Sequence, residues 1–340
     1  MTKLSIIIVN WNTAKLLGQC LESVISDLCL ENGKAPPDVN RQSPVTNHQS
    51  LITEIIIVDN GSTDGSVEMI ESFIRGRLSV TGKNKPSINY RKLITGNRSP
   101  ITLRLIKNKE NLGFAKGNNI GIKEARGEYI MLLNSDTIVK EGAVERLLKV
   151  FEKQTDKVGA VSPLLINTDG SIQKDPCFLK FPSPILILFY YNSLLKKLAL
   201  NFFPKLLFSI TDFSKTAYVD QLPGAAILIR KKVLDRIGIF DEDYQIYFED
   251  TDLCFRMKKA GYKLLLAPEA KIIHLGRQSI KSVIDKEGIE KFYLLNFQSL
   301  FRFCKKHYSF VRYQTIKTIV LKQMFITLKF NLFKKLLDFE

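Results

Sequence analysis

Three short apolar runs in the first half of the chain each end in a cluster of small polar residues. The runs are LSIIIV at 4–9, EIIIV at 54–58 and YIMLL at 129–133. Such continuous apolarity is typical of strands buried on both faces, which occur in parallel sheets covered by helices. Helical stretches at about 13–28, 64–75 and 114–126 separate the runs. The sequence therefore predicts an α/β fold with a doubly wound, mostly parallel sheet.

The polar clusters follow directly after these predicted strands. They are Asn10-Trp11-Asn12, Asp59-Asn60-Gly61 and Asn134-Ser135-Asp136. In open α/β sheets, ligands bind beyond the carboxyl ends of the strands. Any one cluster is explained by turn chemistry alone, since Asp, Asn, Gly and Ser are the usual turn residues. Three clusters at one expected edge favour a binding site, in which the Asp59 carboxylate accepts hydrogen bonds from a ribose hydroxyl or a base N–H.

A glycine-rich segment, NLGFAKGNNIG at 111–121, leads into the third predicted helix. Gly113 precedes the helix start, where unpaired backbone amides are available to phosphate oxygens. Gly113, Gly117 and Gly121 recur every four residues, so they share one helical face and allow close approach to the sheet. The segment is neither GxGxxG nor a Walker loop, and packing alone remains an alternative explanation.

Asp136 is a candidate ligand for Mg²⁺ or Mn²⁺. These hard cations take oxygen ligands from one or two side chains plus the phosphates of a substrate, and would neutralise charge on a departing nucleoside diphosphate. Asn134 offers a weaker amide oxygen, and His274, after a short apolar strand, is a possible additional ligand. The alternatives are a cap for the helix from about Glu141 and a structural histidine.

Six carboxylates lie within twelve residues of the second half. They are Asp241, Glu242, Asp243, Glu249, Asp250 and Asp252. Acids in a first helical turn complement the helix dipole, but six in a strongly basic protein exceed what capping requires. A buried carboxylate among them is a candidate general base for an acceptor hydroxyl.

The composition limits the partners and the compartment. A formal charge of +16 and a pI near 9.5 attract polyanions, phosphorylated small molecules included. Zinc-finger spacing, RNA-binding aromatics and a basic zipper are absent from the sequence, so nucleic acid is not the expected partner. Five scattered cysteines without a CxxC pair favour reduced thiols and a cytoplasmic location.

Two segments interleave leucines and aromatics with lysines, at about 178–213 and from Gly288 onward. Between 288 and 340, ten Lys or Arg residues stand against three carboxylates. Such helices often lie on anionic membranes, so peripheral contact with the inner face of the cell membrane is one expectation. Packing of the apolar faces on the domain is the other. No window reaches the length of about 18 apolar residues that a membrane span needs.

Five motifs in order resemble family-2 inverting glycosyltransferases, most of all their bacterial rhamnosyltransferase-like branch. They are SIIIVNWN, IIIVDNGSTDGS, NLGFAKGNNIGIKEARGEYIMLLNSD, PGAAILIRKKVLDRIGIFDE and YFEDTDLCFRMKKAGYKLLLAPEAKIIHLG. The resemblance implies a GT-A fold over residues 1–280, followed by an amphipathic, basic helical extension at 281–340. Insertions interrupt the domain at about 31–50, 77–100 and 178–213.

The resemblance also implies roles for particular residues. Asp136 corresponds to the metal-binding acid of the DxD motif, Asp250 to the base of the ED motif, and His274 to a late histidine that completes the metal shell. The residues implied in substrate binding are Asn10, Asp59, Gly113, Asn118, Asn134, Gly224 and Glu249. Asn134 stands where many members have the first Asp of DxD, which leaves one charge fewer on the metal.

The implied reaction is a single displacement with inversion. A sugar moves from a nucleoside-diphosphate donor, dTDP-rhamnose-like, to a hydroxyl of a glycan or lipid-linked acceptor in cell-surface polysaccharide synthesis. Transfer from a UDP-hexose or a UDP-N-acetylhexosamine is the alternative within the family. A nucleotide-sugar-binding protein without catalysis is the alternative outside enzymes.

Overall fold

The computed structural model describes residues 2–29, 52–77, 88–93, 101–174, 179–276, 278–326 and 330–337. The polar insertion expected at 31–50 lies outside these ranges. Most of the insertion expected at 77–100 also lies outside them, but its middle forms strand β3 (Ile88–Leu93), which pairs antiparallel with the strand that follows. A polar excursion is therefore an incomplete description of that segment.

Four neighbouring strands of the sheet are parallel, and three of them contain the apolar runs of the sequence. They are β1 (Leu4–Asn10), β2 (Thr53–Asp59), β4 (Ile101–Lys107) and β5 (Tyr129–Asn134). Strand β1 lies between β2 and β5, in a register that places Asn10 beside Asp59 and Val9 beside Asn134. The polar clusters after these three strands therefore share one edge of the sheet.

The sheet continues beyond β5 with strands of both directions. Strand β9 (Ala226–Arg230) is antiparallel to β5 and to β7 (Val158–Ile166), and β10 (Lys263–His274) runs parallel to β7. Two short antiparallel strands, β6 (Thr137–Val139) and β8 (Ala217–Val219), pair with β10. The order across the sheet is β3-β4-β2-β1-β5-β9-β7-β10-β6, a mixed but mostly parallel arrangement.

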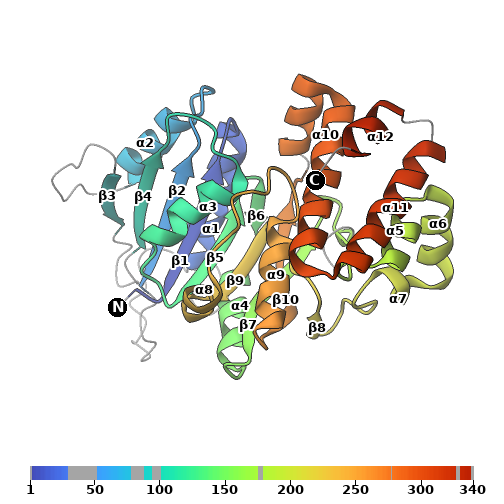
Figure 1. Cartoon of the computed structure of the whole chain (residues 1–340). Coiled ribbons are helices and arrows are strands. Elements are labelled where there is room, and N and C mark those ends of the chain that lie inside the picture. Colours follow the sequence, from blue (N-terminus) through green and yellow to red (C-terminus); the bar gives the residue numbers. More distant parts are fainter. Residues whose placement is uncertain are drawn as a thin grey trace.

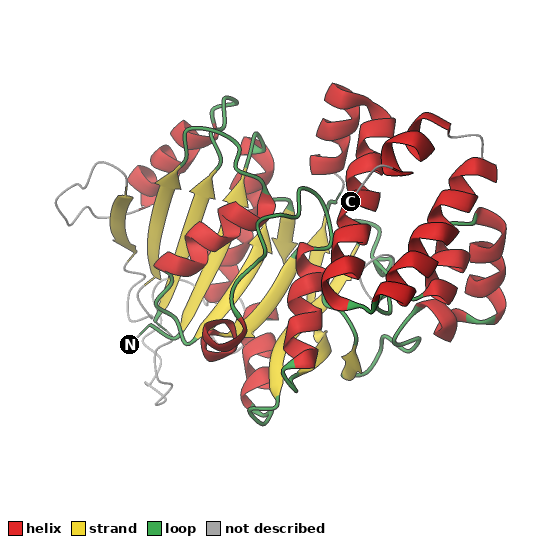
Figure 2. Ribbon diagram, in the orientation of Figure 1, coloured by secondary structure: helices red, strands yellow, loops and turns green. Residues whose placement is uncertain are grey.

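Helices cover both faces of the sheet (Figure 2). On one face α1 (Ala14–Leu28), α2 (Ser66–Arg77) and α4 (Ala143–Glu152) pack on Leu4, Ile6 and Ile8 of β1. On the other, α3 (Phe114–Glu124), α8 (Lys231–Ile237) and α9 (Glu249–Lys259) share a core with Ile7. This alternation along one strand is what a strand buried on both faces requires.

A helical unit lies beside the β10 end of the sheet (Figure 1). Its members are α5 (Pro184–Tyr190), α6 (Ser193–Phe202), α7 (Pro204–Leu207), α10 (Gln278–His307), α11 (Phe310–Ile326) and α12 (Phe330–Leu337). Its buried side chains, such as Phe301 and Ile316, belong to the same apolar cluster as Ile7. The two basic, apolar segments of the sequence thus pack on each other and on the sheet domain. Among the described helices, none combines the length and the apolarity needed to cross a bilayer.

Candidate functional site

The first part of the site is built at the ends of β1 and β2. The Asn10 side-chain amide donates to Asp59 Oδ1 at 2.9 Å and to Ser62 Oγ at 3.1 Å. The Ser62 N–H donates to Asp59 Oδ2 at 2.9 Å. Both Asn10 and Asp59 are buried, so these bonds hold the Asp59 carboxylate in one orientation. Asn10 and Asp59, predicted for one nucleotide pocket, are in direct contact.

The loop that enters α3 is attached to the same edge. Asn60, next to Asp59, donates to the carbonyl of Gly113 at 3.1 Å, and Asn111 accepts from the Gly113 N–H at 2.9 Å. Gly113 has φ 83° and is the residue before α3. A Cβ at this position would meet no atom, so backbone conformation, not crowding, requires a glycine here. The N-terminus of α3 therefore lies beside the Asn10–Asp59 pair.

Asn118, predicted for the same pocket, occupies a different position. It lies one turn into α3, is 2% exposed, and its side-chain amide donates to the Phe114 carbonyl of its own helix at 3.0 Å. Its neighbour Asn119 binds the backbone of Phe240 and donates to Glu242 at 2.8 Å. The asparagine pair thus fastens α3 internally and to the acidic segment.

Two contacts join the end of β5 to the rest of the site. Ser135 Oγ lies 3.0 Å from Thr13 Oγ1, which donates to Asn10. The Asn134 N–H donates to the carbonyl of Ala225 at 2.9 Å. The Asn134-Ser135-Asp136 cluster is therefore connected on one side to the Asn10–Asp59 pair. On the other side it is connected to Gly224 and Ala225, just before β9, which form the Gly224 segment.

Asp136 faces His274, which ends β10. His274 Nε2 lies 3.4 Å from Asp136 Oδ1, and the Leu275 N–H donates to the Asp136 carbonyl at 2.9 Å. Among the described residues, no three His, Cys, Asp or Glu side chains lie close enough together to hold a metal by themselves. The pair thus consists of one carboxylate, an oxygen ligand for metals, and one imidazole, a nitrogen ligand.

Gln173 orients the His274 ring, and sequence reasoning missed it. Its amide nitrogen donates to the His274 carbonyl at 2.6 Å and to Asn167 Oδ1 at 2.8 Å, which turns its oxygen towards His274 Nδ1 at 3.0 Å. With an acceptor at this distance, Nδ1 is the protonated nitrogen. Nε2 faces the Asp136 carboxylate.

Asp250, in the first turn of α9, lies against the Gly224 segment. Its Oδ2 accepts from the Gly224 N–H at 3.0 Å and its Oδ1 from the Thr251 N–H at 2.7 Å. A Cβ on Gly224 would lie 3.3 Å from the Asp250 Cβ and 3.4 Å from the Phe114 ring. Gly224 thus lets the start of α9 approach the start of α3.

Glu249 and Asp250 form a half-buried pair of carboxyl groups. Burial, and then the neighbouring Asp250 charge, raise the pKa of Glu249 to about 8. Burial also raises the pKa of Asp250, but the N–H groups of Gly224 and Thr251 favour its anion. Glu249 Oε2 is buried and has no hydrogen-bond partner among the described residues. The two peptide N–H groups thus favour the anion of Asp250 over that of Glu249 within the pair.

The other four acids of the predicted cluster have partners of their own. Asp241 binds Lys306, Asp243 binds Arg302, Glu242 binds Asn119, and Asp252 binds Arg256, Lys306 and His307. Of the six carboxylates, only Glu249 and Asp250 bind neither a cationic side chain nor a side-chain amide among the described residues. The sequence pattern located the segment but could not separate these two from the rest.

A match to the model of the family described as glycosyl transferase family 2 covers residues 5–238. The chain is 27% identical over 241 residues to N-acetylglucosaminyl-diphospho-decaprenol L-rhamnosyltransferase from Mycobacterium tuberculosis, covering 66% of this chain and 68% of that protein. It is 27% identical over 251 residues to rhamnosyltransferase WbbL from Escherichia coli, covering 68% of this chain and 86% of that protein.

Solved structures show the same fold. The mannosyltransferase PcManGT from Pyrobaculum calidifontis, determined with GDP-Man and Mn²⁺, has a TM-score of 0.51 and 16% identity, over 89% of this chain and 63% of that one. The resemblance to its fold agrees with the GT-A expectation for the sheet and the helices around it. The family match covers more than half of the 340 residues. The chain belongs to glycosyl transferase family 2.

Proposed function

We propose that the protein transfers a sugar of the rhamnose class from a nucleoside diphosphate to a hydroxyl of a glycan or lipid-linked acceptor, with inversion. The observation that carries the proposal is the contact between Asp250 and the Gly224 segment, which is joined through Ala225 to the Asn134–Asp136 cluster. A proton acceptor is thereby connected by short contacts to the residues proposed to bind the donor. The names of the relatives support the sugar class, and the mycobacterial name includes N-acetylglucosaminyl-diphospho-decaprenol.

The donor is proposed to lie along the ends of β1, β2 and β5. The Asp59 carboxylate, held by Asn10 and Ser62, would accept hydrogen bonds from the nucleoside. Backbone N–H groups at the start of α3, after Gly113, suit the diphosphate because the amino end of a helix favours anions. Both features favour a nucleotide donor over a neutral ligand.

Asp136 and His274 fit a divalent cation held partly by the substrate. Nε2 of His274 and a carboxylate oxygen of Asp136 lie 3.4 Å apart, and carboxylate and imidazole are side chains that would hold such a cation. Mg²⁺ and Mn²⁺ commonly use one or two protein ligands and take the rest from phosphates and water. When bound, such an ion supplies charge neutralisation for a departing diphosphate.

Asp250 is proposed to be the general base. Its ionised carboxylate would take the proton of the acceptor hydroxyl as that oxygen forms a bond to the anomeric carbon and the bond to the diphosphate breaks. One displacement without a covalent intermediate inverts the configuration. Glu249, which keeps its proton, would be placed to donate a hydrogen bond to the acceptor. Peptide N–H groups from Gly224 and Thr251 fix the direction of the Asp250 carboxylate.

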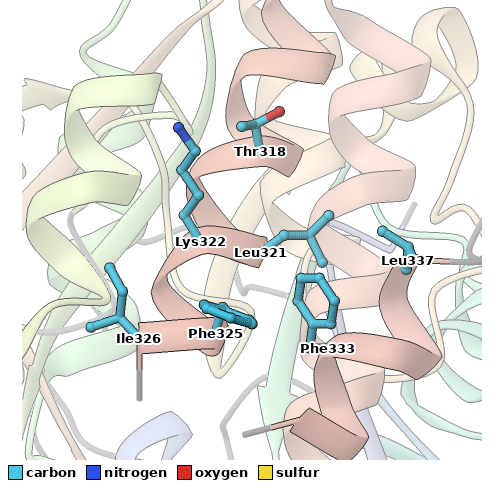
Figure 3. Close-up of a pocket in the computed structure, with 7 residues that line it drawn as sticks. All are labelled: Thr318, Leu321, Lys322, Phe325, Ile326, Phe333 and Leu337. Atoms are coloured by element: carbon cyan, nitrogen blue, oxygen red, sulfur yellow. The ribbon is translucent and has the colours of Figure 1, made fainter. Parts of the chain in front are cut away.

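A lipid-linked acceptor agrees with the surface of the helical unit. Leu194, Leu198 and Phe202 recur every four residues on α6 and are 75%, 43% and 68% exposed. A groove of about 400 Å³ lies between α11 and α12 (Figure 3), and Figure 3 shows Leu321 and Phe333 meeting across it. Lysines lie beside both features, among them Lys197, Lys205, Lys322, Lys334 and Lys335. We propose that this face contacts an anionic membrane that holds the acceptor.

The test is a transfer assay with a panel of nucleoside-diphosphate sugars, dTDP-rhamnose, UDP-hexoses and UDP-N-acetylhexosamines, with and without Mn²⁺. Asp250→Asn should lower turnover by about 10²–10⁴-fold, the usual contribution of a general base, while donor affinity stays near normal. Asp243→Asn is the matched control, because Asp243 is an exposed acid of the same segment paired with Arg302. Wild-type turnover in Asp250→Asn would refute the assignment of the base. Turnover with UDP-sugars but not with dTDP-rhamnose would favour the alternative donor class.

A further inference from the structure

Asp252, two residues after Asp250 on α9, is a fully buried carboxylate surrounded by donors. Its Oδ2 accepts from Arg256 Nε at 2.7 Å. Its Oδ1 accepts from His307 Nε2 at 2.6 Å, from Lys306 Nζ at 2.8 Å and from the Tyr244 hydroxyl at 3.3 Å. The Asp252 side chain is 0% exposed, so removal of a partner would leave a buried charge undercompensated.

Two of these donors come from α10, outside the family match at 5–238. Lys306 and His307 are the last two residues of that helix. The His307 side chain is 5% exposed, and its ring packs against Phe255 and Phe303 with centroids 4.6 and 4.9 Å apart. The C-terminal end of α10 therefore reaches the base-bearing helix directly.

The chain enters α9 through a strained backbone that α10 also holds. Tyr247 and Phe248 have φ 57° and 69°, a region that costs free energy for residues other than glycine. Ser299 of α10 donates to the carbonyl of Ile246, just before them, at 2.8 Å. Strain of this kind persists only where surrounding contacts impose it. The direction of the first turn of α9 thus depends on contacts made by α10.

The electrostatics agree with a permanently charged Asp252. Burial alone would raise its pKa, but hydrogen bonds from His307 and Lys306, with the Arg256 charge, outweigh burial and hold the pKa well below its ordinary value. Asp252 is therefore an anion throughout the neutral range. It is occupied by its donors and is not available to take a proton from an acceptor.

We propose that Lys306 and His307 are positioning residues, which bind Asp252 from α10 and so hold the first turn of α9 with Asp250 directed at the acceptor. The inference rests on the proposed function of Asp250. It assigns the helical unit a part in catalysis besides packing. Because these residues touch no reacting atom, their loss should lower the rate of transfer more than the affinity for the donor.

The experiment compares His307→Leu with His307→Gln in the full chain. Leucine fills space but donates nothing, whereas the glutamine amide places a donor near the position of Nε2. Arg302→Met is the matched control, because Arg302 lies on α10 about one turn earlier and pairs with Asp243 instead. Two readouts are taken: hydrogen exchange at the amides of residues 250–253, and the kcat and donor KM of transfer.

In His307→Leu we expect faster exchange at 250–253 and a kcat lower by roughly 10- to 100-fold, the cost of small misplacements in an active site, with donor KM within about twofold. Glutamine should restore most of both, and Arg302→Met should match the wild type. Should His307→Leu fail to fold, Lys306→Met serves in its place. Wild-type exchange in the variant, an unchanged kcat, or a loss confined to KM overturns the proposal. Absence of transfer by the wild-type protein would instead overturn the proposed function. The exchange data would still show whether Lys306 and His307 hold the first turn of α9.

Discussion

Glu249 and Asp250 are adjacent in the chain but differ in what surrounds their carboxyl groups. Asp250 accepts two peptide N–H groups, from Gly224 and Thr251, and its anion is stabilised by them. Glu249 has a buried oxygen without a partner among the described residues, so its ionised form is the less favourable one. One residue of the pair is thus ready to accept a proton and the other to keep one.

The raised pKa of Glu249 makes stability depend on pH. In the unfolded chain the group ionises near its ordinary pKa of about 4.3, and in the folded protein near 8. Its contribution to stability is therefore complete below the unfolded pKa and is lost as pH rises through the folded pKa. Glu249→Gln removes this loss, so the variant should exceed the wild type by about 1–3 kcal/mol in unfolding free energy at pH 8, since one pKa unit corresponds to about 1.4 kcal/mol. Thermal unfolding at several pH values checks this, and a difference that shrinks as pH rises would contradict it.

Gln173 should matter for metal affinity through His274. Gln173→Leu removes the acceptor at Nδ1, so the ring is free to protonate Nε2 or rotate, and Mn²⁺ binding should weaken by roughly 10-fold or more. Mn²⁺ titration by electron paramagnetic resonance, with nucleoside diphosphate present, measures this without turnover. Gln154→Leu, two residues after the end of α4, is the control and should bind like the wild type. Equal affinities in all three proteins would show that Gln173 has no such effect.

The residues that sequence reasoning located and those it missed differ in a physical way. Asp59, Asp136 and Asp250 stand at a strand end or a helix start. Such places can be recognised from the neighbouring residues in the sequence. Gln173 acts through His274, 101 residues away, and no local pattern reports a contact of that length. Asn118 stays a prediction, since the structure shows only that its side-chain amide donates to a carbonyl of its own helix.

Among the elements, α3 shows how a sequence spacing becomes a packing contact. A Cβ on Gly117 would lie 2.8 Å from Val9, and one on Gly121 would overlap Ile7. The spacing of four therefore places α3 directly on β1, which brings Gly113 to the strand ends. The predicted close approach to the sheet is confirmed for Gly117 and Gly121, whereas Gly113 precedes the helix and has no atom close to its Cβ position.

Gly121→Ala tests that contact. The added methyl group has no room beside a fully buried strand residue, so we expect a loss of about 1–3 kcal/mol in unfolding free energy, the usual cost of overpacking. Gly18→Ala is the matched control, because Gly18 lies inside α1 and the nearest atom to its Cβ would be 3.8 Å away. Alanine is the better helix former by about 0.5–1 kcal/mol, so this variant should be neutral or stabilised. Urea unfolding of both variants measures the difference, and equal stabilities would contradict it.

The whole molecule combines an α/β sheet domain with a helical unit that the sequence described less well. The alternating strands and helices of the first half were predictable because each has a local pattern, which for the strands is a continuous apolar run. The segments at 178–213 and from 288 onward are apolar on more than one side, and their pattern alone left packing and membrane contact both open. The fold shows that both segments pack, since Leu186 and Ile187 of the first and Phe301 and Ile316 of the second are buried. The exposed apolar side chains of α6 remain after that packing is satisfied.

Those remaining side chains, with the lysines beside them, should bind the protein to anionic vesicles. A formal charge of +16 adds attraction of about 1 kcal/mol for each Lys or Arg near the surface, and salt should weaken it. We expect co-sedimentation with phosphatidylglycerol vesicles at low salt and much less with neutral phosphatidylcholine.

Leu194→Gln with Leu198→Gln keeps the charge and removes apolar area worth about 1.5–3 kcal/mol for each side chain fully buried, so binding should fall at least about tenfold. Tyr218→Gln, which removes a 53% exposed side chain on β8, should bind like the wild type. The proposed contact of α6 would be contradicted if the wild type did not bind anionic vesicles at low salt, or if the double variant bound them equally well. The acceptor would then have to reach Asp250 from solution.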